Sequence, residues 1–338
     1  MQPLVALGLL GIPRLLRSTE LLVGVWPRVA LIMAKVAPLP ERRILQSFTA
    51  PSGRVLEYAF DGRCAVGDPV LFHFHALGMN GMGMGPPFLS YKMYRKPPLP
   101  VTEWALLPFR IVAINRAGYG KSTMGNVKLS DWTYDHFAVD VAALADHLNA
   151  PKFAVFGGSS GGPHVIAAAA LLKGRVTAAL SLSGDANYAP GFPKGKKANE
   201  AIADGAPFTY TDGSALCHYG GMCGEGSVCC GCCCALCCPV GTKADLRVEV
   251  KPLSFPLADI PDTTAVFLVQ GDKDDTTDPN CARFQKAQIS HAELTMLPGA
   301  GHVQLPPAAF DEVIKKLHAA ALKGHIESSA PAEQLIAR

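Results

Sequence analysis

From residue 44 onward, the chain alternates between two hydrophobic patterns. Short apolar runs rich in β-branched and aromatic residues, bounded by Gly, Pro and Asp, predict buried strands. Longer stretches with apolar residues at helical spacing predict helices. We expect strands at 44–50, 53–60, 69–75, 109–115, 152–157, 176–184, 264–271 and 292–299, and helices at 132–150, 162–174, 280–289 and 308–322. This alternation indicates an α/β fold, in which a mostly parallel central sheet carries helices on both faces.

Two regions interrupt the alternation and set the expected domain boundaries. Residues 185–250 are rich in glycine and polar residues, and we expect them to form an inserted cap. Residues 323–338 are polar and alanine-rich, and we expect a loosely held tail. The sequence therefore predicts one domain over residues 44–322 that includes the cap.

The first 43 residues form an apolar and basic extension. Within residues 1–40, Arg14, Arg17, Arg28 and Lys35 oppose only Glu20, and prolines interrupt both apolar runs before either could cross a bilayer. Residues 1–40 fit a targeting or membrane-associating segment, or else a helical extension packed on the domain. The compartment stays open between cytoplasmic and organellar or membrane-associated, and the oligomeric state stays unknown. The formal net charge of +3 gives no reason to expect a nucleic-acid partner.

The glycine-rich turn at residues 157–162, GGSSGG, joins a predicted strand to a predicted helix. It fits the nucleophile elbow G-x-S-x-G, in which flanking side chains would collide across the turn. Ser159 and Ser160 both fit, and we favour Ser159 because the strand ends near Phe156. The backbone N–H of Ser160 would then donate to an oxyanion. Alternatively, the turn only packs tightly or binds phosphate.

A serine nucleophile needs a base and a carboxylate that orients it. Several acids follow the predicted strand at 264–271, and His302 lies in a glycine-flanked loop after the next strand. The order serine, acid, histidine is the one expected for the α/β-hydrolase fold, and a parallel sheet would bring these strand ends together.

At these motifs the chain resembles the α/β-hydrolase family, in particular its cofactorless esterase-like and peptidase-like members. NRAGYGKS is similar to the family's D-R-x-G-x-G-x-S stretch, and the serine of GGSSGG is followed by the expected glycines. GDKD matches the acid turn G-x-x-D, which implies that Asp274 is the acid. The loop HFHALGMN implies a second oxyanion donor, the backbone N–H of Leu77.

Two departures and several rival residues accompany this resemblance. His75-Ala76 replaces the family's His-Gly, which puts the geometry of the oxyanion loop in question, and Asn115 replaces an aspartate. The rival acids are Asp185, Asp272, Asp275 and Asp278. Three further histidines are expected to be structural: His73 and His75 as core or loop-bracing residues, and His164 as a packing residue on the helix after the elbow, with a position facing the pocket as the alternative.

Nine of the eleven cysteines lie between Cys217 and Cys238. Their overlapping C-x-x-C pairs are more crowded than those of a structural zinc site. Metal binding, disulfides, acylation and an unstructured insert all stay open, and we assign this cluster no chemistry.

Together these features predict a serine hydrolase that cleaves an ester or related acyl bond of a small molecule. Ser159 would attack, His302 would transfer the proton, and Asp274 would hold the imidazolium. This chemistry needs no cofactor or metal. The alternative is a protein on the same fold that binds a small ligand with little or no turnover, and a weaker one is a cysteine-rich metal or redox module.

Overall fold

The computed structural model describes residues 45–60, 68–77, 109–185, 240–249, 253–302 and 306–329. All of them belong to a compact unit that spans residues 40–338. The N-terminal extension, most of the expected cap and the cysteine cluster lie outside the described residues.

An eight-stranded sheet has the order β1-β2-β4-β3-β5-β6-β7-β8. Its strands are β1 (Leu45–Thr49), β2 (Val55–Phe60), β3 (Val70–Phe74), β4 (Arg110–Asn115), β5 (Phe153–Gly158), β6 (Val176–Leu182), β7 (Ala265–Gly271) and β8 (Glu293–Leu297). β1, β2 and β4 pair antiparallel, and the strands from β4 to β8 pair parallel. The sheet is mostly parallel, as predicted.

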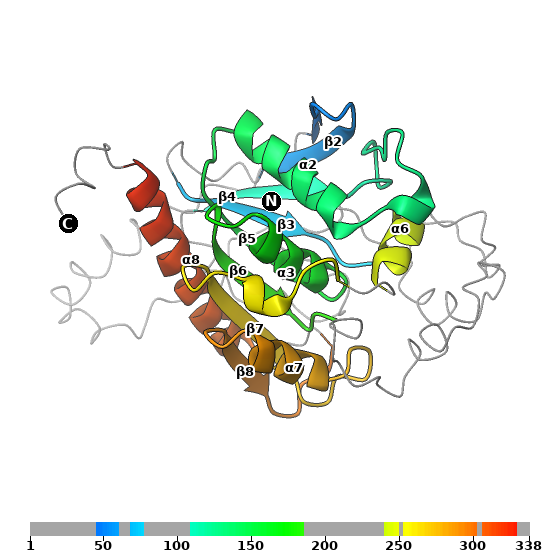
Figure 1. The fold of residues 1–338 in the computed structure, drawn as a ribbon. Helices are drawn as coiled ribbons and strands as arrows, with labels where there is room; N and C mark the ends of the chain where they lie inside the picture. Colours follow the sequence, from blue (N-terminus) through cyan, green and yellow to red (C-terminus); the bar gives the residue numbers. More distant parts are fainter. Residues whose placement is uncertain are drawn as a thin grey trace, which may run out of the picture. The chain divides into compact units, whose positions relative to one another are not determined.

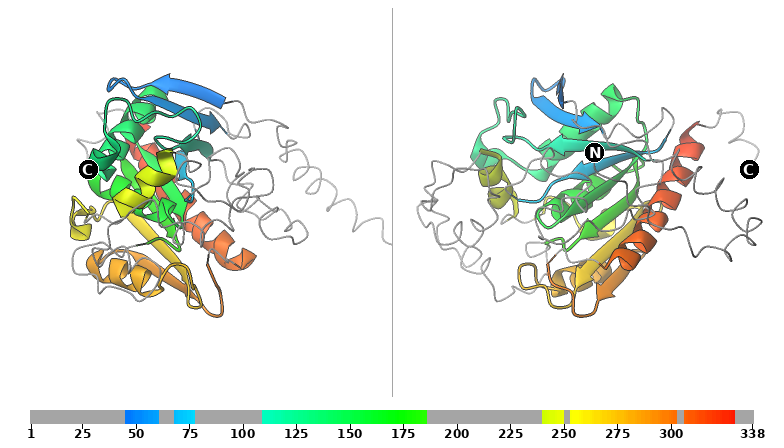
Figure 2. Two further views of the ribbon diagram at one scale, coloured as in Figure 1. Left: turned by 90° about the vertical axis from the view of Figure 1, so that its right-hand side faces the viewer. Right: turned by 180° about the vertical axis from the view of Figure 1, so that it is seen from behind.

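Helices cover both faces of this sheet (Figures 1 and 2). The helices are α2 (Tyr134–His147), α3 (Gly161–Leu171), α6 (Val240–Glu249), α7 (Asn280–Gln288) and α8 (Pro307–Ser329), with short 3₁₀ turns at Leu129–Asp131 and Leu257–Asp259. α2, α3 and α7 lie on one face, and α8 runs across the other over β5, β6 and β7. The expected α/β architecture is therefore confirmed.

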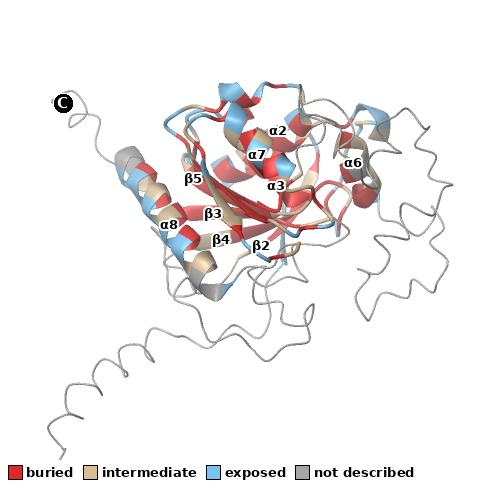
Figure 3. Ribbon diagram, turned by 90° about the horizontal axis from the view of Figure 1, so that it is seen from below, coloured by how far each residue is buried: buried red, intermediate tan, exposed pale blue. Residues whose placement is uncertain are grey.

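The central strands are apolar on both faces because helices cover both of them. All five residues of β3 are buried, and Figure 3 shows buried residues throughout the middle of the sheet. Successive side chains of a strand point to opposite faces. Thus Phe72 and Phe74 join the core under α2 and α3, whereas Leu71 joins the core under α8.

Two helices differ from the sequence expectation. α8 continues to Ser329, beyond the predicted end at residue 322, so residues 323–329 are helical rather than a loose tail. Gly324 lies in this extended part and packs so closely on β6 that a Cβ there would lie 2.2 Å from Thr177 Cγ2. The second difference is α6, which the sequence analysis did not predict within the cap region.

Within the part of the chain that the structure describes, no helix is both long enough and apolar enough to span a membrane.

Candidate active site

Two of the loops that carry predicted site residues follow strands at the point where the order of the sheet reverses. β4 follows β3 in the chain and lies on one side of it, whereas β5 lies on the other side. In parallel sheets, a crevice forms outside the carboxyl ends of the strands at such a switch point. Leu77 follows β3, and Ser159 follows β5.

The turn after β5 has the backbone that a nucleophile elbow requires. Ser159 has φ 54°, in the left-handed region that side-chain-bearing residues rarely adopt. A Cβ at Gly157 would lie 2.6 Å from the carbonyl oxygen of Gly161, and a Cβ at Gly161 would lie 2.3 Å from that of Phe74. Both glycines are therefore required by close backbone approach, and the strained serine between them is Ser159.

Ser159 lies within hydrogen-bonding distance of His302. The two residues follow β5 and β8, yet Ser159 Oγ is 3.0 Å from His302 Nε2. Ser159 is partly exposed, and the His302 side chain retains 12% of its accessible surface.

Asp274 holds the other side of the imidazole. His302 Nδ1 lies 3.0 Å from Asp274 Oδ1 and 2.9 Å from Oδ2. Gln270 Nε2 and the backbone N–H groups of Thr276 and Thr277 also donate to the Asp274 carboxylate.

These contacts keep the Asp274 carboxylate ionised in a buried position. Burial alone would raise the pKa of Asp274. The hydrogen bond and charge of His302 outweigh this effect, together with the amides of Thr276 and Thr277. The pKa of Asp274 therefore lies below its ordinary value of 3.8, which suits a group that must stay charged beside an imidazolium.

The rival acids have other partners. Asp272 Oδ1 accepts the backbone N–H of Gly299, and Asp278 Oδ1 accepts that of Asn280 at the start of α7. Asp275 is exposed, with Thr276 Oγ1 3.4 Å from its carboxylate. Asp185 Oδ1 lies 3.7 Å from the thiol of Cys281. Asp274 differs from these four acids because its carboxylate lies within hydrogen-bonding distance of His302 Nδ1.

Two of the remaining histidines pack among aromatic rings. His73 stacks on Phe156 with ring centroids 5.5 Å apart. His164 contacts Tyr134 and Phe137 edge-on, at 5.0 and 4.7 Å. Burial and then the Arg116 charge lower the pKa of His164 to about 3, so this ring is neutral at pH 7.

His75 fixes the start of the loop that follows β3. Its Nδ1–H donates to the Ala76 carbonyl at 2.9 Å, and its Nε2 accepts the backbone N–H of Arg116 at 3.2 Å. Burial, and then the charge of Arg116, hold the pKa of His75 well below 6.5, so the imidazole ring stays neutral. Ala76 is not among the residues with positive φ. The backbone at residue 76 therefore has no need of glycine.

A buried ionic cluster behind the elbow escaped the sequence analysis. Arg116 pairs with Asp245 of α6, and each side chain is only 2% exposed. Glu249, also on α6, accepts a hydrogen bond from the hydroxyl of Ser160. Asp245 and Glu249 lie four positions apart in the sequence, so they share a helix face. The spacing of four residues was visible in the sequence, but it indicates a shared face only if residues 240–249 form a helix, which the sequence did not predict.

Burial and the Asp245 carboxylate raise the pKa of Glu249 well above 4.5. Asp245 already forms two hydrogen bonds with the guanidinium of Arg116. This side of the elbow is therefore rich in carboxylates, with one buried arginine between them.

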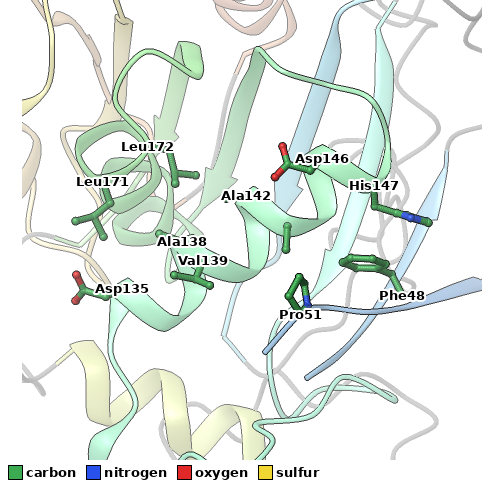
Figure 4. Close-up of a pocket in the computed structure, with 11 residues that line it drawn as sticks. Phe48, Pro51, Asp135, Ala138, Val139, Ala142, Asp146, His147, Leu171 and Leu172 are labelled. Carbon is green, nitrogen blue, oxygen red and sulfur yellow. The ribbon is translucent and has the colours of Figure 1, made fainter. Parts of the chain in front are cut away.

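A pocket of about 560 Å³ lies elsewhere on the domain (Figure 4). Phe48, Pro51, the outer face of α2 and the end of α3 line it. Leu171 is the last residue of the eleven-residue helix α3, whereas Ser159 precedes its first turn. At 1.5 Å per residue, the two ends of α3 are separated by about 16 Å. This pocket is therefore separate from the serine.

Among the described residues, no group of three or more His, Cys, Asp or Glu side chains could hold a metal ion.

Comparisons with known proteins agree with this architecture. Residues 104–204 match the family model of the alpha/beta hydrolase fold. A search of curated protein sequences finds no match.

Similar solved structures include an esterase from Rhodococcus sp. ECU1013, at 17% identity and a TM-score of 0.56 over 81% of this chain and 98% of that one. A carboxylesterase structure from the thaumarchaeon Nitrososphaera gargenis has 18% identity and a TM-score of 0.56, over 82% of this chain and 100% of that one. Carboxylesterase CesB from Bacillus subtilis has 13% identity and a TM-score of 0.55, over 88% and 98%. At these identities, the likeness establishes the fold.

Proposed function

We propose that this chain, which has the α/β-hydrolase fold, is a serine hydrolase that cleaves an ester or related acyl bond of a small molecule. One observation carries the proposal: the His302 imidazole lies within hydrogen-bonding distance of Ser159 on one side and of the buried Asp274 on the other. Structural neighbours include esterases, so esters are the first substrates to test.

In the proposed reaction, Ser159 Oγ attacks the substrate carbonyl while His302 Nε2 accepts its proton. Asp274 stabilises the imidazolium that results. The backbone N–H groups of Ser160 and Leu77 receive the negative oxygen of the tetrahedral intermediate.

The intermediate collapses when His302 returns the proton to the leaving alcohol, and an acyl-enzyme forms on Ser159. Water then attacks the carbonyl of the acyl-enzyme while His302 accepts a proton from the water. His302 returns this proton to Ser159 as the carboxylic acid is released. These steps use only the chain's own residues.

The replacement of the family's glycine by Ala76 would favour a ligand-binding protein with little turnover if it distorted the oxyanion loop. Because the Ala76 backbone is outside the left-handed region, this replacement gives no specific support to that alternative. Ligand binding without turnover is kept as one outcome of the test.

The direct test is reaction with a fluorophosphonate, which phosphonylates activated serines, followed by mass spectrometry of the peptides. We expect an adduct on Ser159 in the wild type and none in Ser159→Ala. Ser183→Ala is the matched control, since Ser183 also has a positive φ, 49°, but follows the neighbouring strand β6. It should retain the adduct on Ser159. A folded wild type without adduct would reject the hydrolase and leave ligand binding as the function to test.

A further inference from the structure

Arg116 lies between the two loops that carry the proposed oxyanion donors. It follows β4 and is 2% exposed. One arm of its guanidinium, Nη1, donates to the carbonyl of His75 in the loop after β3. A second arm, Nη2, lies 3.4 Å from the Ser160 hydroxyl in the elbow. The same side chain therefore contacts both loops.

These contacts fix the backbone close to each donor. The Arg116 backbone N–H binds His75 Nε2, and its guanidinium binds the carbonyl of the same residue. Leu77 is two residues further on, so its position depends on how His75 is held. On the other side, Ser160 bears both the hydroxyl near Arg116 and the N–H that would face the oxyanion.

Asp245 of α6 keeps the guanidinium in this position. Arg116 Nε lies 3.2 Å from Asp245 Oδ1, and Nη2 donates to Oδ2. Tyr119 also donates to Oδ2, at 2.7 Å. A buried guanidinium that loses its carboxylate is strongly destabilised where it lies, so it would shift away from the two loops.

The geometry points to Asp245 and Arg116 as positioning residues for the oxyanion hole, which makes the catalytic rate depend on the docking of α6. This inference rests on the proposed function, since it concerns the same reaction. It assigns a role to α6, a helix at the end of the predicted cap region that supplies no group to the triad.

The chain contains a second buried arginine–aspartate pair that serves as a matched control. Arg54 Nε lies 2.7 Å from Asp140 Oδ1, with side chains 7% and 5% exposed. This pair links the residue before β2 to α2, and Arg54 also donates to the carbonyl of His136 and lies over the ring of Trp132. Asp245→Asn and Asp140→Asn therefore remove the same charge from comparable pairs.

The test compares both variants with the wild type on an ester and its thionoester, in which sulfur replaces the carbonyl oxygen. Sulfur accepts hydrogen bonds poorly, so a well-placed oxyanion hole favours the oxygen ester. We expect Asp245→Asn to lower kcat for the oxygen ester roughly 10- to 100-fold, with KM changed less than about threefold. The preference for oxygen over sulfur should fall at least about fivefold. Asp140→Asn should leave that preference unchanged, because loss of folded protein lowers both rates equally.

A second variant covers the case in which Asp245→Asn does not fold. Tyr119→Phe removes one hydrogen bond to Asp245 and keeps the ion pair, and it should lower the oxygen preference by a smaller factor. Equal preferences in Asp245→Asn, Tyr119→Phe and wild type would overturn the inference and leave the proposed function intact. A wild type that hydrolyses neither ester and takes no fluorophosphonate would instead reject the proposed function itself.

Discussion

Ser159 holds a left-handed backbone angle that costs an L-residue roughly 1–2 kcal/mol. The packing around the elbow enforces this angle, because the carbonyls of Gly161 and Phe74 occupy the space where side chains at Gly157 and Gly161 would lie. Strain of this kind persists where the surroundings determine the conformation, and it is common at reactive residues. The glycines of the turn therefore allow three segments of backbone to come into contact: the turn itself, the start of α3 and the end of β3.

The elbow glycines should be intolerant of even one methyl group. Gly161→Ala would place a Cβ 2.3 Å from the Phe74 carbonyl, so the elbow must move. We expect fluorophosphonate labelling of Ser159 to fall by more than about tenfold, with a lower Tm. Gly174→Ala is the control, since Gly174 has φ 78° with no atom within 4 Å of an added Cβ. It should cost about 1 kcal/mol of stability and leave the labelling rate unchanged. Equal labelling in both variants would contradict the steric argument.

The buried carboxylate of Asp274 predicts a pH dependence of stability. Its folded pKa lies below 3.8, so its contribution is fully present above about pH 4 and is lost as the pH falls through the folded pKa. The difference in unfolding free energy between wild type and Asp274→Asn should therefore be largest near neutral pH and shrink on acidification. Denaturant titrations between about pH 3 and 7 measure it.

The same substitution should lower kcat by roughly 10³- to 10⁴-fold, because an amide facing His302 Nδ1 favours the wrong tautomer. Asp275→Asn, an exposed position in the same loop, is the control and should retain activity. A difference in unfolding free energy that stays constant with pH would mean that the Asp274 carboxylate gains nothing from His302 and its hydrogen-bond donors.

At the scale of elements, the sequence predicted the helices and strands whose apolar residues face a core. β5 and α3 follow from this rule, since every residue of β5 from Phe153 to Gly157 is buried and α3 is buried from Gly161 to Ala170. α6 follows a different rule. Its buried positions include Asp245 and Thr242, so its inner face is partly polar and gives no apolar period.

The far end of α8 shows the same limit. Gly324 lowers helix propensity and resembles a stop signal in the sequence. In the structure it lies inside the helix, at a point where a Cβ would collide with Thr177 on β6. Close approach between two elements is a tertiary fact, and single-sequence patterns do not contain it.

At the scale of the whole molecule, the candidate site is assembled from loops that are far apart in the chain. Ser159 and His302 could be named from the sequence because each follows a recognisable strand, and a parallel sheet gathers such strand ends along one edge. Asp274 was chosen among the acids after its strand because GDKD resembles the family's G-x-x-D turn. The partners of Arg116 could not be named in this way. Their contact depends on where α6 packs at the end of the predicted cap region, which no local pattern specifies.

This architecture predicts that the insertion can be shortened without loss of the reactive serine. The contacts among Ser159, His302 and Asp274 join residues outside 186–239, and so do the described core clusters. We expect that replacing residues 190–235 with a Gly-Ser linker of about 12 residues, which spans roughly 20 Å, preserves cooperative unfolding. Labelling of Ser159 should stay within about threefold of wild type, whereas the relative kcat/KM for short and long acyl esters should change.

The control for this replacement keeps the full length and changes the cysteines between Cys217 and Cys238 to serine. If the insertion acts as a cap over the substrate, its length and shape matter, and the serine variant should retain the wild-type ester preference. Loss of labelling in the shortened chain would show that the insertion supports the sheet. A changed preference in the serine variant alone would assign substrate choice to the thiols. Both variants retain α6 and Asp245. A loss of kcat in both of them, similar to that in Asp245→Asn, would therefore indicate that α6 is misplaced rather than that a cap is lost.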